Sequence, residues 1–280
     1  MLSYRHSYHA GNFADVLKHL VQIAVIDYLH RKDKPLAIHD SHGGAGLYQI
    51  DSEHMQKTGE YRDGIGRLLG RATGVAVIDR YLEVVAGFNA GGELTVYPGS
   101  PAISASLLRG DDRLTVTEKH NTDFPLLEAL LNGRPHVQVH HEDANQGLKS
   151  LLPPLHKRGL VLIDPSYELN GDEAYTLAGV REGLRRFNTG CFAIWYPVIG
   201  RHRADAFAER LARLGGEALR AELNVLEPSA ARGMTGSGML IINPPWALEE
   251  QLREALPVLH RALSRGHGHG GWLVRRYPAA

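Results

Sequence analysis

Acidic side chains follow the predicted strands of this chain at the points where the strands end. Glu118 and Asp143 each close a short apolar run. A carboxylate at such a point can accept hydrogen bonds from both hydroxyls of a ribose, which is the role expected for Glu118. An acceptor at Asp143 could take the amino hydrogens of an adenine ring. Both residues come after a glycine-rich string at 40–46, so together they indicate a site for an adenosine-bearing cofactor without a pyrophosphate.

The glycine-rich string reads Asp40-Ser41-His42-Gly43-Gly44-Ala45-Gly46. Glycines let the chain turn tightly and let a ligand approach the backbone. The string lacks the Gly-x-Gly-x-x-Gly spacing and the lysine of a P-loop, which disfavours ordinary dinucleotide and nucleoside triphosphate sites. Taken alone, it is also compatible with a simple strand-to-helix turn.

The most specific motif is Asp164-Pro165-Ser166-Tyr167, directly after the run GLVLI. Here the sequence resembles the S-adenosylmethionine-dependent amino-methyltransferases, whose signature is Asp/Asn/Ser-Pro-Pro-Tyr/Phe/Trp. An exocyclic amine is a poor nucleophile, because its lone pair is delocalised into the ring. The Asp164 carboxylate and the Pro165 carbonyl can accept its hydrogens, which favours in-line attack on a sulfonium methyl. Tyr167 offers a ring for an extruded base, and Ser166 replaces the usual second proline.

A second copy of this pattern, Asn243-Pro244-Pro245-Trp246, follows the run GMLII. The fourth strand after the cofactor loop is expected to adjoin the methyl group, whereas a last or next-to-last strand is expected at the edge of the sheet. We therefore assign the chemistry to Asp164 and not to Asn243.

These residues require a sheet whose strand ends meet. Five apolar runs separated by helix-length segments predict parallel strands covered on both faces. They are residues 35–46, 113–120, 136–144, 159–167 and 191–198. Two further runs, 218–226 and 237–246, are candidates for an antiparallel pair that closes the sheet. The prediction is a doubly wound α/β sheet with its ligand beyond the carboxyl ends of the strands.

A helix is expected to begin after Asn12, which can serve as its N-cap, with Asp15 completing a capping-box-like start. Asp15, Lys18, His19 and Gln22 then share one polar face. The span 49–97 is too long for one crossover and contains helix-like stretches. We interpret 49–97 as a helical insertion over the strand ends, with 1–48 and 98–280 as the core.

The composition is that of an ordinary globular protein: 280 residues, 43% hydrophobic and 22% charged. No apolar run approaches the roughly 18 residues that span a bilayer, and the N-terminus has no signal-peptide pattern. With 31 Lys+Arg against 31 Asp+Glu, nucleic-acid binding would need a local patch. Cys191 is expected to pack in a core, and the string RGHGHGG near the C-terminus to be a flexible tail that binds no metal. We expect a cytoplasmic protein.

Nearly end to end, the chain resembles the bacterial ribosomal RNA large-subunit methyltransferase J family. Six strings carry the resemblance. They are residues 4–12 (YRHSYHAGN), 14–19 (ADVLKH), 40–46, 97–101 (YPGSP), 195–198 (WYPV) and 232–239 (RGMT-x-SGM). Two departures occur: the family's usual Thr-His-Ala-Gly-Ala-Gly reads as residues 41–46 here, and its Pro-Pro reads Pro165-Ser166.

The resemblance implies a Rossmann-like methyltransferase fold with a mostly parallel seven-stranded sheet, acting as a monomer. It implies N6-methylation of an adenine in 23S ribosomal RNA, either naked or at an early stage of assembly. Cofactor contacts are expected at His19, His42, Gly44, Ser100, Glu118, Asp143 and Asp164. Catalysis is expected at Asp164, Pro165 and Tyr167. RNA contacts are expected at Tyr4, His6 and Lys18.

Three other functions compete with this one. A DNA adenine-N6 methyltransferase would use the same base pocket. A metallohydrolase could use His140, His141, Glu142 and Asp143, but adjacent histidines on a strand point to opposite faces, which disfavours a metal site. An RNA chaperone without catalysis would need neither the cofactor nor Asp164.

Overall fold

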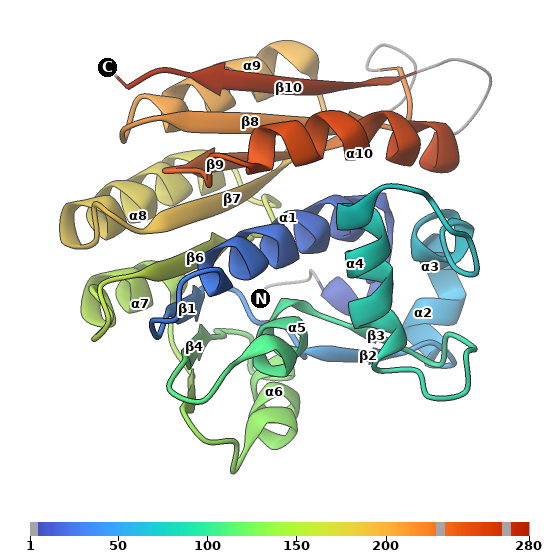
Figure 1. Ribbon diagram of the computed structural model, residues 1–280, viewed down its shortest axis with the longest axis horizontal. Coiled ribbons are helices and arrows are strands. Elements are labelled where there is room, and N and C mark those ends of the chain that lie inside the picture. Colours follow the sequence, from blue (N-terminus) through green and yellow to red (C-terminus); the bar gives the residue numbers. More distant parts are fainter. Residues whose placement is uncertain (1–4, 228–232, 265–269, 280) are drawn as a thin grey trace.

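The computed structural model describes residues 5–227, 233–264 and 270–279. Eight strands in these ranges form one sheet, in the order β10-β8-β9-β7-β6-β1-β4-β5 (Figure 1). The strands are β1 (Ala37–Asp40), β4 (Arg113–Thr117), β5 (Val137–His140), β6 (Gly159–Ile163), β7 (Cys191–Val198), β8 (Ala218–Asn224), β9 (Gly236–Ile242) and β10 (Gly271–Tyr277). The five predicted parallel strands and the antiparallel β8–β9 pair are confirmed.

The strand number of seven was wrong, because β10 forms an eighth strand just after the glycine- and histidine-rich string. It pairs antiparallel with β8 at the edge of the sheet. An antiparallel strand can keep one face in solvent, so few of its side chains need to be apolar. Only Val274 of β10 is fully buried, and Arg276 bonds to Glu249 instead. The predicted tail itself, residues 265–269 with its two histidines, lies outside the described residues.

The order of the strands creates a crevice between β1 and β6. From β1 the chain moves outward to β4 and β5, then returns to the other side of β1 to form β6 and β7. The connections after β1 and β6 therefore leave the sheet in opposite directions. In open α/β sheets, ligands bind at this switch point, outside the carboxyl ends of the strands.

The expectation that Asn243 follows a strand at the edge of the sheet was wrong. Strand β9, which precedes it, is not an edge strand, since it lies between β7 and β8 and runs antiparallel to both. Because β9 runs in the opposite direction to β6 and β7, its carboxyl end and Asn243 lie at the end of the sheet opposite to Asp164. Its side chain donates to the carbonyls of Asn188 and Gly190, both at 2.8 Å, and closes a local turn. Strand direction, rather than position at an edge, separates the two motifs.

Helices cover both faces of the sheet (Figure 1). One face carries α1 and α10 over β6–β10, with α4, α5 and α6 beside them, and the other carries α7, α8 and α9. Each face has its own apolar cluster. The helices are α1 (Phe13–His30), α2 (Glu53–Thr58), α3 (Glu60–Asp63), α4 (Ala76–Ala86), α5 (Ser100–Leu107), α6 (Asp123–Leu131), α7 (Ala144–Ser150), α8 (Asp172–Arg186), α9 (Arg201–Ala212) and α10 (Leu248–Leu263), with the 3-10 turns η1 (His6–Tyr8) and η2 (Ile65–Arg67). Within the described ranges, no helix combines the length and apolar character needed to cross a membrane.

Helix α1 begins where the sequence predicted. The Asn12 side chain caps it by accepting from the backbone N–H groups of Ala14 and Asp15. The Asp15 carboxylate does not close a capping box, because it accepts from Gly11 N instead of Asn12 N. The polar face of α1 points into the molecule: Asp15, Lys18, His19 and Gln22 are all buried.

Between β1 and α5 the chain forms helices α2, α3 and α4, framed by a small antiparallel pair of β2 (Leu47–Gln49) and β3 (Val96–Pro98). Helix α4 packs on α1, while α2 packs on the 3-10 turn η1 near the N-terminus. This segment therefore touches both the first helix of the sheet core and the residues that precede it.

Candidate active site

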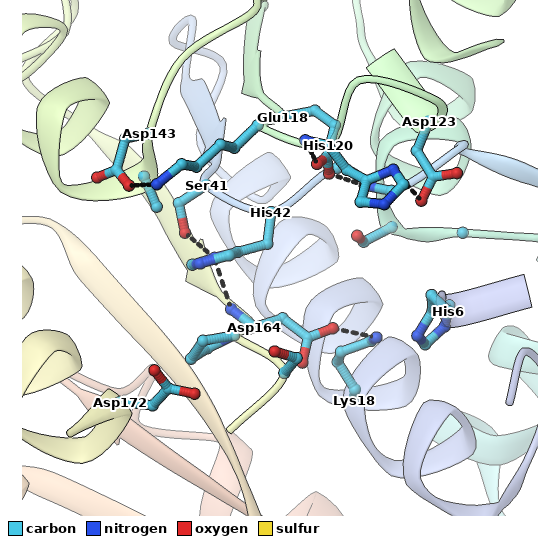
Figure 2. A pocket seen from close by; sticks show the side chains of 18 of the residues that line it. His6, Lys18, Ser41, His42, Glu118, His120, Asp123, Asp143, Asp164 and Asp172 are labelled. Carbon is cyan, nitrogen blue, oxygen red and sulfur yellow. Dashed lines mark hydrogen bonds and ion pairs between the residues drawn. The ribbon is translucent and has the colours of Figure 1, made fainter. Parts of the chain in front are cut away.

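A pocket of about 320 Å³ opens at the carboxyl ends of β1, β4, β5 and β6 (Figure 2). It lies at the switch point of the sheet. Its walls combine a glycine turn with acidic, basic and aromatic side chains. They are His6, Lys18, Ser41, His42, Gly43, Gly44, Tyr48, Gly99, Ser100, Glu118, Lys119, His120, Asp123, Asp143, Ala144, Asp164, Pro165, Ser166, Leu169, Asp172 and Tyr175.

The structure brings together residues that follow four of the five parallel strands, β1, β4, β5 and β6. His42, Glu118, Asp143 and Asp164 all line this pocket, as do Gly44, Ser100 and Pro165. These residues are far apart along the chain, but the carboxyl ends of parallel strands lie at the same end of the sheet. The register is strict: Asp40 at the end of β1 aligns with Val116 of β4 and Leu162 of β6.

The glycine turn after β1 is shaped by its neighbours. A Cβ atom at Gly43 would lie 2.6 Å from side-chain carbons of Val116 and Leu127. Gly44 has φ +56°, and a Cβ there would meet the Tyr48 hydroxyl at 2.5 Å. Side chains are therefore excluded at both positions, and bare backbone lines this part of the pocket.

Glu118 is fixed by backbone donors. One of its carboxylate oxygens accepts from Gly44 N and the other from His120 N, each at 2.6 Å. Burial raises its pKa, against the effect of these hydrogen bonds. The carboxylate thus ties the glycine turn to the end of β4.

His42 joins the turn to the Asp164 motif. Its Nδ1 atom accepts from the Asp164 backbone N–H at 3.3 Å, and the Ser41 hydroxyl lies 2.8 Å from the same nitrogen. Burial lowers the pKa of His42 to about 4, so its ring is neutral near pH 7. The backbone of Asp164 is therefore held from the β1 side of the crevice.

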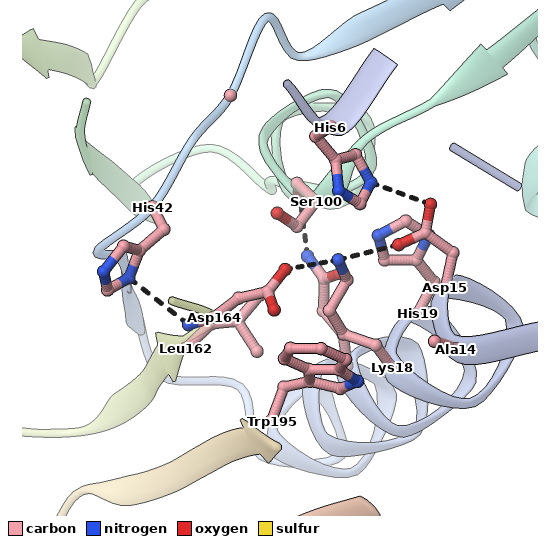
Figure 3. Close-up of polar contacts among 12 residues, drawn as sticks. His6, Ala14, Asp15, Lys18, His19, His42, Ser100, Leu162, Asp164 and Trp195 are labelled. Carbon is pink, nitrogen blue, oxygen red and sulfur yellow. Dashed lines mark hydrogen bonds and ion pairs between the residues drawn. The ribbon is translucent and has the colours of Figure 1, made fainter. Parts of the chain in front are cut away.

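The Asp164 side chain is held from helix α1. Lys18 Nζ lies 2.5 Å from Asp164 Oδ2 and 2.8 Å from Asp15 Oδ1, and Asp15 also binds His6 (Figure 3). Burial alone would lower the pKa of Lys18, but the two carboxylates raise it above its usual value. The ammonium therefore stays charged between two acids. Its side chain is 4% exposed, a setting that does not fit contact with an RNA phosphate.

Asp143 lies on the outer wall of the pocket, where it caps helix α7 by accepting from Asn145 N at 3.0 Å. Lys119 Nζ lies 2.9 Å from it, and the Tyr175 hydroxyl also donates to it.

Asp40 is the buried last residue of β1. Burial raises its pKa to about 7.

Two residues named from the sequence, His19 and Tyr167, do not line the pocket. His19 is fully buried behind the pocket, with Nδ1 2.8 Å from the Tyr97 hydroxyl. The Tyr167 hydroxyl donates to the Trp195 carbonyl, and its ring lies against Trp195 and Phe207. Tyr4 lies outside the described residues. The roles assigned to these three residues stay predictions.

Sequence reasoning missed several wall residues. Asp172 and Tyr175 lie in the first turn of α8, a helix that follows the Asp164 motif, and the order of elements was a signal for them. No local signal pointed to Lys119 or Asp123. In the described part of the chain, no group of three or more His, Cys, Asp or Glu side chains is arranged to hold a metal ion.

A family model described as "Ribosomal RNA large subunit methyltransferase D, RlmJ" matches residues 33–275. The chain belongs to this family. It is 47% identical over 278 residues to the ribosomal RNA large subunit methyltransferase J of Escherichia coli, covering 98% of this chain and 99% of that protein. It is 45% identical to the Haemophilus influenzae protein of the same name, covering 98% of each.

A crystal structure from Legionella pneumophila shares this fold. It is 32% identical, with a TM-score of 0.86, and the match covers 95% of this chain and 98% of that one. The fold is thus the Rossmann-like fold of the methyltransferases, and the resemblance noted in the sequence is confirmed.

The RlmJ family is a methyltransferase family, and its cofactor is S-adenosylmethionine. The residues present fit this group. Gly43 and Gly44 present bare backbone to the pocket, Glu118 offers a carboxylate bonded to Gly44 N, and Asp143 offers a second carboxylate on another part of the wall. These are the acceptors that the hydroxyls of a ribose and the amine of an adenine require.

Proposed function

We propose that this protein transfers a methyl group to the exocyclic N6 amine of an adenine in 23S ribosomal RNA. The observation that carries the proposal is the Asp164-Pro165-Ser166-Tyr167 motif, whose first three residues line the cofactor pocket at the end of β6. The names of the relatives from Escherichia coli and Haemophilus influenzae support ribosomal RNA as the substrate class.

Asp164 and Pro165 act on the amine. The Asp164 carboxylate and the Pro165 carbonyl oxygen accept hydrogen bonds from the two N–H groups of the amine, which frees the nitrogen lone pair for attack. S-adenosylmethionine, when bound, supplies the electrophilic methyl group. Asp164 can then hold the proton that the methylated nitrogen releases. The ion pair with Lys18 keeps this carboxylate in a fixed orientation while its backbone N–H is held by His42.

We assign cofactor binding to the residues around the glycine turn. Glu118 would accept the ribose hydroxyls and Asp143 the adenine amine, with His42, Gly44 and Ser100 completing the walls. Asp164 would contact both cofactor and substrate. His19 does not line the pocket, so it would contribute to cofactor binding from its buried position beside Tyr97.

We assign RNA contact to the N-terminal segment, with Tyr4 and His6 nearest the flipped base and Tyr167 as a candidate stacking surface. His6 lines the pocket and supports this assignment. Lys18 would act on Asp164 and the base rather than on a phosphate. We expect the enzyme to act as a monomer on naked or early-assembly RNA.

We propose further that residues 49–97 form an insertion in a core made of 1–48 and 98–280, and that this insertion anchors the N-terminal segment. Support comes from contacts across the two parts. Ser7 lies 2.8 Å from His54, and Glu60 accepts from both His9 and Asn12. A segment held in this way would stay at the pocket mouth between turnovers.

The test is methylation of a 23S rRNA transcript with labelled S-adenosylmethionine, followed by digestion to nucleosides and mass spectrometry. The RNA treated with wild-type protein should yield N6-methyladenosine, and the RNA treated with Asp164→Ala should yield no methylated nucleoside. A duplex DNA of the same length serves as the competing substrate. Preferential methylation of DNA would replace the RNA proposal with the DNA adenine-methyltransferase reading, and a product other than N6-methyladenosine would refute the assignment of the atom.

A further inference from the structure

Asp15 is a buried carboxylate that touches two side chains of the pocket wall. It lies in the first turn of α1, and its side chain is 2% exposed. Its Oδ1 atom lies 2.8 Å from Lys18 Nζ, and its Oδ2 atom lies 2.9 Å from His6 Nε2 (Figure 3). Oδ2 also accepts from Gly11 N at 2.8 Å. Asp15 itself does not line the pocket.

Capping of the helix does not explain this carboxylate. The side chain of Asn12 already accepts from the first free backbone N–H groups of α1, those of Ala14 and Asp15. The carboxylate instead turns away from the helix end toward His6 and Lys18. Its one backbone contact, Gly11, belongs to the segment that carries His6 into the pocket.

The charges show that the three side chains form one unit. Burial alone would raise the pKa of Asp15, but His6 and Lys18 hold it well below its usual range. A buried charge needs a partner close by, because water cannot solvate it. Asp15 is therefore ionised whenever Lys18 is paired with it, and it supplies the second of the two anions that fix the ammonium.

The geometry of Lys18 depends on this second anion. With Asp15 on one side and Asp164 on the other, the ammonium has one defined position between them. With Asp164 alone, the long lysine side chain could follow that carboxylate into the pocket and compete with the target amine for its oxygens. His6 would lose its contact with the Asp15 carboxylate, although its ring would still lie against Tyr48.

We propose that Asp15 is a positioning residue for methyl transfer: it holds His6 and Lys18 in the arrangement that presents Asp164 to the target amine. This inference rests on the proposed function of Asp164. A displacement of about 1 Å at a reacting group can cost about 100-fold in rate. Asp15 thus acts on catalysis without contact with substrate or cofactor.

The test compares Asp15→Asn with a matched control, Asp112→Asn. Asp112 is equally buried. It accepts from the backbone N–H groups of Leu36 and Arg109, and its carboxylate also contacts the side chains of His30 and Arg109. It precedes β4, at the end of the sheet opposite to the pocket. Both substitutions remove one buried negative charge from a histidine and a basic side chain, so both are expected to lower the melting temperature.

The expected difference lies in catalysis. On a 23S rRNA transcript, Asp15→Asn should lower kcat about 100-fold, with the Kd for S-adenosylmethionine changed less than about threefold. Asp112→Asn should keep kcat within about twofold at a temperature where it is folded. Asp15→Glu, which keeps the charge, should be about tenfold more active than Asp15→Asn. If Asp15→Asn fails to fold, Asp15→Glu is compared with wild type instead, and its kcat should be about tenfold lower.

A readout without RNA separates this inference from the proposed function. In protein labelled with [15N]histidine, Asp15→Asn should shift the ring signals of His6, and Asp112→Asn should shift those of His30 instead. A kcat for Asp15→Asn within about threefold of wild type, or unmoved His6 signals, would overturn the inference. A wild-type protein inactive on 23S rRNA would overturn the proposed function, and the His6 signals would still decide whether Asp15 holds that side chain.

Discussion

Lys18 Nζ lies 2.5 Å from Asp164 Oδ2, although the two residues are 146 positions apart in the chain. The contact joins the first turns of α1 to the loop after β6, so the helix that covers the sheet also orients the residue that we assign to catalysis. A buried lysine paired in this way is not free to neutralise a phosphate. Its position instead makes the acid of the Asp164 motif dependent on the packing of α1.

Asp164→Ala should lower the rate of methyl transfer by at least about 10²–10³-fold, because the acceptor for the target amine is lost. Asn243→Ala is the control from the second proline motif. It should lower stability, since Asn243 has φ +54° and donates to two carbonyls, while most turnover is retained. Single-turnover rates on 23S rRNA measure both. Greater damage from Asn243→Ala would reverse our assignment of the two motifs.

Glu118→Ala should remove most of the thermal stabilisation that S-adenosylmethionine gives. A ligand at a hundredfold excess over its Kd stabilises the folded state by about 2.7 kcal/mol. The substitution removes both the expected ribose acceptor and the ties to Gly44 and His120. Glu128→Ala on the exposed side of α6 is the control. A ligand-induced shift in melting temperature equal to that of wild type would exclude Glu118 from the site.

Glu60→Ala should weaken methylation of RNA about tenfold while the Kd for S-adenosylmethionine stays within about twofold of wild type. Glu60 binds His9 at 3.0 Å and Asn12 at 2.9 Å, and its hydrogen bond raises the pKa of His9. Without it the N-terminal segment loses an anchor on the insertion. Glu83→Ala, in α4 of the same insertion, is the control because the Glu83 side chain is 70% exposed and pairs with Arg80 of the same helix. Equal effects of the two variants would contradict the anchoring role.

His39 should make the protein sensitive to acid. It is buried in β1, neither ring nitrogen has a hydrogen-bond partner among the described residues, and burial lowers its pKa to about 3. The unfolded chain binds this proton below about pH 6.5, whereas the folded chain does not until about pH 3. Stability is therefore present above pH 6.5 and lost as the pH falls, by about 2 kcal/mol between pH 7 and pH 5.

Urea unfolding at pH 7 and pH 5 measures this loss. His39→Phe keeps a ring of similar size without a titrating nitrogen, so it should lose less stability than wild type over the same interval. The loss that remains would come from His19 and His42, whose pKa values burial also lowers. An identical pH dependence of wild type and variant would show that His39 is already neutralised in another way.

The sequence by itself determined the local elements and the strand ends of this protein. Helix α1 begins at the predicted Asn12 cap, because a side-chain acceptor and the apolar spacing of one helix are local properties. The five parallel strands follow from apolar runs, and their carboxyl ends predicted that His42, Glu118, Asp143 and Asp164 would face one site. The i, i+3 spacing of Asp15 and Lys18 was visible, but not its use.

Only the tertiary structure decided what the polar face of α1 does and where the last strands go. The burial of Lys18 between two acids depends on a contact with a residue on a distant strand, and no local pattern encodes it. Strand β9 lies between β7 and β8 and not at the edge of the sheet, so the expected position of Asn243 was wrong. Which strands pair depends on packing across the whole sheet. Strand β10 escaped prediction because an edge strand needs few apolar residues. The periodicity of apolar residues can be read from the sequence. Contacts between distant segments form only when the core packs, so the sequence pattern alone does not show them.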